Sequence, residues 1–220
     1  MTLVNNNLTI WLEDKYKGLE VLNKYGLYEQ YLRAIYGVLE KATREHPRTT
    51  AIRFDLHLPG VMGWSDMPCE YGTEVITKFM ESLKAQIKAD LVRKKREGQR
   101  THLCTVRYIW AKEISKANQP HYHVALLLNK DAYLGLGDYR SVRDNVAGMI
   151  YRAWASALKY GHNQVMGLIH FPYNPYYHLN SNGLAYKQQC NEVFKRLSYL
   201  AKRETKLYGA RTKNFGCSRK

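Results

Sequence analysis

Residues 113–129 read EISKANQPHYHVALLLN, and this stretch determines how the rest of the chain is interpreted. His121 and His123 are separated by one residue, and side chains two positions apart in a β-strand point to the same face. Pro120 precedes them and is tolerated as the first residue of a strand. The alternation therefore predicts a strand over 121–129 that presents both imidazoles on one face, with Tyr122 and aliphatic side chains on the other.

The run before this strand, 103–113, is also strand-like, and Ser115–Gln119 is predicted to be the turn between two antiparallel strands. If Glu113 pairs opposite His121 in this hairpin, Ala111 lies opposite His123. The carboxylate of Glu113 then shares a face with the two imidazoles.

Two imidazoles and a carboxylate on one face form an open set of ligands for a divalent cation. Such a site leaves positions for water or for a phosphate oxygen. We therefore predict a metal site at Glu113, His121 and His123. His57 is a further possible ligand. The alternative is a half-solvated strand face that happens to carry two histidines.

Composition indicates an anionic partner. The chain has 220 residues with 34 Lys and Arg against 19 Asp and Glu, a formal net charge of +15. Such an excess attracts polyanions and makes binding to phosphates dependent on salt. The 18 tyrosines supply rings on which unpaired bases stack. Nucleic acid is the favoured partner; an acidic protein or a lipid surface is the alternative.

The sequence shows no apolar run of membrane-spanning length and no secretory signal at its start. Its four cysteines lack C-x-x-C spacing and are interpreted as reduced thiols. We expect a cytoplasmic protein that does not bind membranes.

Periodicity divides the remaining chain into further elements. Residues 1–48 are predicted to form a helical appendage, and 49–220 the main domain. In 49–59, Arg53, Asp55 and His57 alternate with apolar residues and face away from the core. Helices are expected over 73–96, 141–160 and 184–207, a short strand over 165–171 and a loop over 172–183.

Tyr199 lies off the apolar stripe of the last predicted helix. It is surrounded by basic residues that are expected to bind nucleic acid, together with Arg53 from the first strand: Lys195, Arg196, Lys202, Arg203 and Lys206. Nearby cations stabilise a phenolate and the phosphate that it would attack. We interpret Tyr199 as a candidate nucleophile, with Tyr186 and Tyr208 next. The alternative is a surface tyrosine beside a basic stripe.

Taken together, these motifs resemble the HUH endonucleases, specifically rolling-circle replication initiation (Rep) proteins. The nearest resemblance is to the inovirus-type, or YagK/YfjJ C-terminal domain, family. The matching segments are RFDLHLP (53–59), QPHYHVALLLN (119–129), FKRLSYLAKRETK (194–206) and, more loosely, NFGCSR (214–219).

The resemblance implies an α+β fold, with a central antiparallel sheet of RRM-like or ferredoxin-like character and helices on one face. It assigns Glu113, His121 and His123 to Mg²⁺ or Mn²⁺, Tyr199 to the nucleophile, and Lys202 to the lysine of Y-x-x-K. Tyr122 is bulkier than the usual central residue of the His motif. No second tyrosine follows Y-x-x-x-Y spacing from Tyr199, which implies a single-tyrosine enzyme.

The implied activity is nicking of a single-stranded origin hairpin. The products are a 5′-phosphotyrosine link and a 3′-OH primer for rolling-circle replication, and the ends are later rejoined. The sequence has no Walker A motif, so a separate host helicase and polymerase are expected. Two alternatives are a prophage-derived DNA-binding regulator without nicking activity and a metal-dependent nuclease that uses water.

Overall fold

The computed structural model describes residues 7–59, 72–114, 120–140, 143–204, 206 and 213–219. Its α-helices are α1 (Glu29–Glu45), α2 (Glu74–Arg96), α3 (Val146–Leu158), α4 (His162–Val165) and α5 (Tyr186–Ser198). Single 3₁₀ turns are η1 (Asn23–Tyr25), η2 (Met166–Leu168) and η3 (Tyr199–Ala201). The predicted turn over Ser115–Gln119 and the candidate Tyr208 lie outside the described residues.

Six strands form one antiparallel sheet in the order β10-β6-β7-β5-β8, and β9 also pairs with β5. The strands are β5 (Arg48–His57), β6 (Arg107–Ile114), β7 (Pro120–Asn129), β8 (Ile169–His170), β9 (Tyr176–Asn180) and β10 (Phe215–Cys217). The predicted α+β class is confirmed. β8 is shorter than the strand expected over 165–171, and β9 occupies part of the expected loop.

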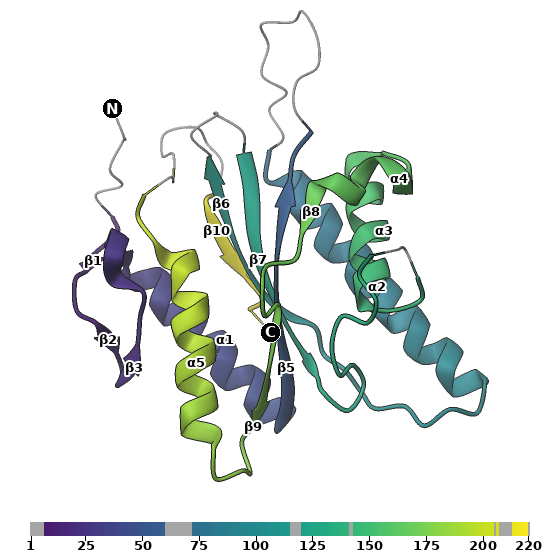
Figure 1. Ribbon diagram of the computed structural model, residues 1–220, viewed down its shortest axis with the longest axis horizontal. Coiled ribbons are helices and arrows are strands. Elements are labelled where there is room, and N and C mark those ends of the chain that lie inside the picture. Colours follow the sequence, from purple (N-terminus) through teal and green to yellow (C-terminus); the bar gives the residue numbers. More distant parts are fainter. Residues whose placement is uncertain are drawn as a thin grey trace, which may run out of the picture.

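Helices cover both faces of this sheet, which corrects the expectation of helices on one face. Figure 1 shows α1 and α5 on one side and α2 and α3 on the other. The α2–α3 side buries one alternate set of strand residues, including Phe54, Tyr122 and Val124. The α1–α5 side buries the other set, including Ala111 and Ala125. The sheet is therefore the middle layer of three.

Residues 1–48 were expected to be helical, but the described part of this segment is α-helical only in its second half. Four short strands, β1 (Ile10–Trp11), β2 (Lys15–Tyr16), β3 (Leu19–Glu20) and β4 (Leu27–Tyr28), precede α1 and pair as β1–β4 and β2–β3. Leu32, Ile35 and Leu39 of α1 pack in the same apolar cluster as Ala125 and Leu127 of β7. Only the second half of the segment has the helical period.

The last helix ends earlier than the expected 207. After Ser198 the chain makes the η3 turn, and Lys202 adopts an extended conformation with φ −58° and ψ 143°. Lys202 forms a β-bridge with Leu27, and the N–H of Arg203 donates to the carbonyl of Gly26 at 2.9 Å. Pairing with the β4 region replaces the next helical turn, although the local sequence is helix-compatible.

No helix among the described residues has both the length and the apolar character required to cross a bilayer.

Candidate active site

The candidate site forms where β5, β6 and β7 meet at one end of the sheet. Glu113 pairs opposite His121 and Ala111 opposite His123, so the register predicted from the sequence is confirmed. On the other side of β7, Asp55 pairs opposite His123 and His57 opposite His121. Because alternate residues share a face, these polar side chains lie on the α1–α5 side of the sheet.

The predicted metal ligands come together. One ligand atom from each of Glu113, His121 and His123 lies within 4.8 Å of the other two. Nε2 of His123 is 3.0 Å from Oε2 of Glu113 and 3.2 Å from Nε2 of His121. Glu113 and His123 are buried, whereas His121 is half-buried. The cluster is therefore anchored in the protein and accessible through His121.

Asp55 orients the His123 ring from its other nitrogen. Oδ1 of Asp55 lies 2.7 Å from Nδ1 of His123. Nη2 of Arg53 also lies 2.9 Å from this nitrogen, but a guanidinium only donates. The shorter distance assigns the bond to the carboxylate, and Arg53 is adjacent because it also pairs with Asp55. A proton on Nδ1 then leaves Nε2 to face the cluster.

The donor set fits a divalent cation. With Nδ1 of His123 donating to Asp55, its Nε2 lone pair faces a carboxylate oxygen of Glu113 and a ring nitrogen of His121. Converging lone pairs repel unless a cation, either a proton or a metal ion, lies between them. Two imidazoles and one carboxylate suit Mn²⁺, and Mg²⁺ favours the oxygen ligand. Glu113, His121 and His123 would hold the ion.

Two lysines neutralise Glu113. Nζ of Lys202 is 2.7 Å from Oε2, and Nζ of Lys206 is 3.3 Å from Oε1. Burial alone would raise the pKa of Glu113, but the His123 hydrogen bond and the lysine charges outweigh it and the pKa is lowered. Burial lowers the pKa of Lys206 to about 8, against the opposing effect of Glu113. The site thus contains an ionised carboxylate within a positive environment.

Tyr199 lies directly beside the cluster. Its ring centroid is 5.2 Å from that of His123, with the rings nearly perpendicular. Nζ of Lys202 donates to the Tyr199 hydroxyl at 2.5 Å and contacts Glu113 at the same time. Burial would lower the pKa of Lys202, but its bonds to Glu113 and Tyr199 raise it overall. Lys202 is therefore an ammonium that bridges the phenol and the carboxylate.

Two further histidines border the site. The His57 ring stacks on that of His121 at 5.5 Å, and Nδ1 of His170 lies 3.5 Å from Oδ2 of Asp55. Both side chains are exposed at the surface. The His57 ring is nevertheless partly desolvated by its neighbours, and this lowers its pKa. His170 was not singled out from the sequence, because it is 115 residues from Asp55 and no local pattern links them.

The predicted nucleic-acid contacts divide into buried and exposed residues. Lys206 was expected off the apolar stripe of the last helix as a nucleic-acid contact, but its side chain is fully buried against Glu113. Arg53 is likewise 6% exposed and pairs with Asp55. Lys195 is exposed and pairs with Glu20 at 2.6 Å. Arg196 is half-buried and Arg203 is exposed.

Tyr186, the second candidate nucleophile, lies at the opposite end of α5 from Tyr199. Thirteen residues of helix separate them by about 20 Å. Its hydroxyl is 2.9 Å from the hydroxyl of Thr43 on α1. Of the two candidates within the described residues, Tyr199 is therefore the one that lies at the cluster.

The chain belongs to the YagK/YfjJ C-terminal domain family, whose model matches residues 13–218. It is 42% identical to the uncharacterized protein YagK of Escherichia coli strain K12 over 192 residues, which cover 86% of this chain and 92% of YagK. It is 33% identical to the uncharacterized protein YfjJ of the same strain over 194 residues, covering 86% and 93% of the two chains. No solved structure matches it.

Proposed function

We propose that this protein is a single-tyrosine HUH endonuclease that nicks and rejoins single-stranded DNA through a covalent link to Tyr199. The carrying observation is the Lys202 ammonium, which contacts both the Tyr199 hydroxyl at 2.5 Å and Glu113 of the His–His–Glu cluster at 2.7 Å. If Lys202 served only to stabilise the fold, its ion pair with Glu113 would be sufficient, and the contact with the Tyr199 hydroxyl would not be required. A nucleophile that develops negative charge next to a metal-held phosphate needs such a donor.

The chemistry is a transesterification. When bound, Mg²⁺ or Mn²⁺ would polarise the scissile phosphate as a Lewis acid. The Tyr199 oxygen attacks phosphorus and its proton leaves to water, while Lys202 donates to the oxygen as it becomes charged. The bond from phosphorus to the 3′ oxygen breaks, and that oxygen takes up a proton. The products are a 5′-phosphotyrosine and a free 3′-OH.

The 3′-OH serves as a primer, and the phosphotyrosine conserves the energy of the broken bond. A later 3′-OH attacks the phosphotyrosine and releases Tyr199, which rejoins the strand. We propose that the protein acts in this way as an initiator of rolling-circle replication in the cytoplasm of a bacterial host, with a separate helicase and polymerase. The net charge of +15 supports an extended DNA contact.

The test is a denaturing gel of the protein incubated with a single-stranded hairpin oligonucleotide, 3′-labelled, and Mn²⁺. The label is placed at the 3′ end because the fragment with the new 5′-phosphate stays on the protein. We expect a labelled band at the size of the protein, lost in Tyr199→Phe and in EDTA. Tyr186→Phe is the matched control and keeps the band. An adduct that persists in Tyr199→Phe would assign the nucleophile to another residue.

The same gel separates the other two functions. Cleavage without an adduct would indicate a nuclease in which water attacks the phosphate. Binding without cleavage or adduct, over a range of hairpins, would indicate a DNA-binding regulator. Both results would reject the tyrosine mechanism.

A further inference from the structure

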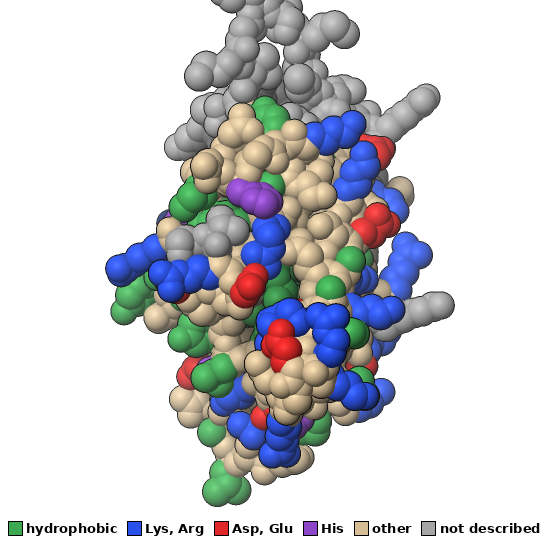
Figure 2. Space-filling model, turned by 90° about the vertical axis from the view of Figure 1, so that its right-hand side faces the viewer, with side chains coloured by type: hydrophobic (Ala, Val, Ile, Leu, Met, Phe, Trp, Pro, Cys, Tyr) green, Lys and Arg blue, Asp and Glu red, His purple; other side chains and the backbone are tan. Residues whose placement is uncertain are grey.

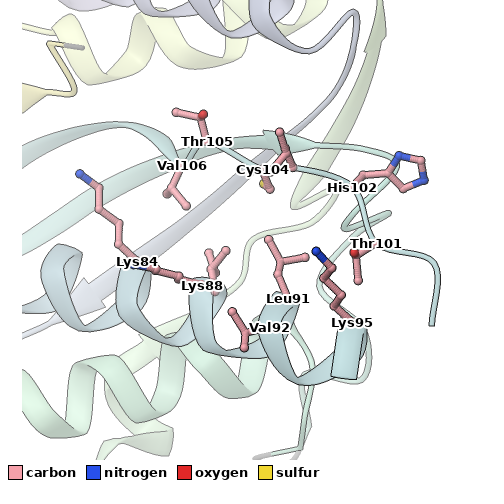
Figure 3. Close-up of a pocket in the computed structure, with 12 residues that line it drawn as sticks. Lys84, Lys88, Leu91, Val92, Lys95, Thr101, His102, Cys104, Thr105 and Val106 are labelled. Carbon is pink, nitrogen blue, oxygen red and sulfur yellow. The ribbon is translucent and has the colours of Figure 1, made fainter. Parts of the chain in front are cut away.

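A groove of about 780 Å³ lies between α2 and the segment 101–106 that leads into β6. Figure 3 shows side chains from both walls directed toward one another across it. Its apolar lining is aliphatic or thiol: Ile87, Leu91, Val92, Leu103, Cys104 and Val106. Val92 is 61% and Leu103 89% exposed. Apolar side chains of this size on both rims mark a surface suited to an apolar partner.

Three lysines run along the helical wall of this groove. Lys84, Lys88 and Lys95 lie at positions i, i+4 and i+11 of α2, so they share one helix face with Leu91. Of the described residues, no Asp or Glu forms an ion pair with any of the three. None of the twelve residues that line the groove is acidic. The groove therefore combines an apolar floor with uncompensated positive charge.

Two other cations near the C-terminal end of the same helix are paired with acidic residues. Arg93 pairs with Asp90 at 2.7 Å and with Glu97 at 2.9 Å, and Lys94 pairs with Asp90 at 2.7 Å. Figure 2 shows the side of the molecule on which α2 and α3 lie, where Lys and Arg side chains are spread widely and acidic side chains are fewer.

The non-helical wall is fixed in place by side chains from elsewhere in the fold. Nδ2 of Asn129 donates to the carbonyl of Leu103 at 2.7 Å, and the N–H of Thr105 donates to Nε2 of His46 at 3.1 Å. These bonds tie the segment to the ends of β7 and α1. A partner would therefore meet a preformed groove and would not have to order this wall.

The lining distinguishes between two kinds of anionic partner. Unpaired bases bind by stacking on aromatic rings, and this groove has no Phe, Tyr or Trp among its lining residues. An amphipathic helix binds by placing apolar side chains in an aliphatic groove. Acidic residues beside those apolar side chains would meet the three lysines.

We infer that this groove docks an acidic amphipathic helix of a partner protein. Lys84 and Lys95 are eleven residues apart, about 16 Å along α2, so the partner segment spans roughly three helical turns.

The groove is distant from the candidate active site. Thr105 of the groove lies just before β6 and Glu113 of the site lies near the end of β6, so the two are about 25 Å apart at the rise of a strand. The partner therefore binds while the candidate active site is occupied, and the inference does not depend on the nicking activity.

Fluorescence anisotropy with the full chain tests this inference. The probe is a labelled synthetic peptide of about 18 residues, roughly 27 Å as a helix, with Leu on one face and Glu flanking it. A scrambled peptide of the same composition is its control. We expect the amphipathic peptide to bind and Lys88→Glu with Lys95→Glu to weaken binding about tenfold. A peptide with Lys in place of Glu should bind this variant more tightly than it binds the wild-type protein.

The control variant is Lys78→Glu with Lys187→Glu, which changes the net charge equally at exposed sites outside the groove. It should bind the acidic peptide within about twofold of the wild type, and circular dichroism should show both variants folded. Equal binding of the scrambled peptide, no binding by the wild type, or equal weakening in both variants would overturn the inference. So would a dT oligonucleotide that competes with the peptide and loses affinity only in the groove variant, because it would assign the groove to nucleic acid.

Discussion

Oδ1 of Asp55 lies 2.7 Å from Nδ1 of His123, on the opposite edge of the ring from the nitrogen that faces Glu113. This contact sets the ring orientation and directs Nε2 toward the cluster. Burial would raise the pKa of Asp55, but the His123 bond and the Arg53 charge outweigh it and lower the pKa. Carboxylates in this position raise the basicity of a metal-binding imidazole.

Replacing Asp55 therefore affects the metal site without removing a ligand. We expect Asp55→Asn to weaken Mn²⁺ binding about 10- to 100-fold by isothermal titration calorimetry, because the amide keeps the shape but lacks the charge. Asp131→Asn removes a surface partner of Arg48 and is the control. Equal Mn²⁺ affinities for Asp55→Asn and wild type would contradict the assigned role.

His121 is the ligand that can be removed with least damage to the fold, because it is half-buried at the rim. At Mn²⁺ concentrations about 100 times Kd, binding stabilises the wild type by about 2.7 kcal/mol. We expect His121→Ala to lose most of this increase in a thermal unfolding experiment, and EDTA to abolish it in the wild type. His162→Ala, an exposed histidine on α4, should retain it. A full Mn²⁺ shift in His121→Ala would remove this residue from the site.

Lys202 and Arg203 are adjacent cations in different environments. Lys202 is buried against Tyr199 and Glu113, whereas Arg203 is exposed. We expect Lys202→Met to slow nicking about 100- to 1,000-fold, the range for a lost donor to developing negative charge, with Mn²⁺ binding retained. Arg203→Met makes the same change in charge and should slow it far less in a single-turnover assay. Equal losses in the two variants would indicate a general effect of charge.

The ion pairs of Asp90 predict how the stability of the fold depends on pH. Tyr133 and Arg93 donate to it at 2.9 and 2.7 Å, and Lys94 pairs with it at 2.7 Å. Burial would raise the pKa of Asp90, but these partners outweigh it and lower the pKa. A lowered carboxyl pKa stabilises the fold above the unfolded-state pKa, and this stabilisation is lost as pH falls through the folded-state value.

We expect Asp90→Asn to reduce the free energy of unfolding at pH 7 by about 1–3 kcal/mol. The difference from wild type should shrink as pH falls below about 4, where the carboxyl group is protonated in the unfolded state. Urea unfolding at successive pH values measures this. Tyr133→Phe removes one neutral donor and should keep most of the pH dependence. A difference that stays constant between pH 7 and low pH would contradict the assigned ion pairs.

The local pattern suggested the strand register that the structure has. The His-x-His spacing and the short link to the preceding strand suggested a pairing of Glu113 with His121 that puts the carboxylate and both imidazoles on one face, and this pairing is observed. The strand alternation also placed Asp55 on that face. Two-residue periodicity determines the face of a strand residue whatever packs on it.

Sequence did not predict what covers that face. Lys202 and Lys206 were expected on the last helix, off its apolar stripe. Instead η3 and the Leu27 bridge end that helix, and both side chains are buried beside Glu113. The bridge joins residues 175 positions apart, so no local pattern signals it. The same holds for His170 beside Asp55. Tertiary pairing determined these positions, against the local helical propensity.

Mapping the residue that carries DNA tests the central proposal most directly. The wild-type protein is incubated with the hairpin and Mn²⁺, digested with nuclease and protease, and analysed by tandem mass spectrometry. We predict a nucleotide-bearing peptide whose modification is on Tyr199. Modification of a different residue, or nicked DNA with no modified peptide at all, would contradict the proposed mechanism.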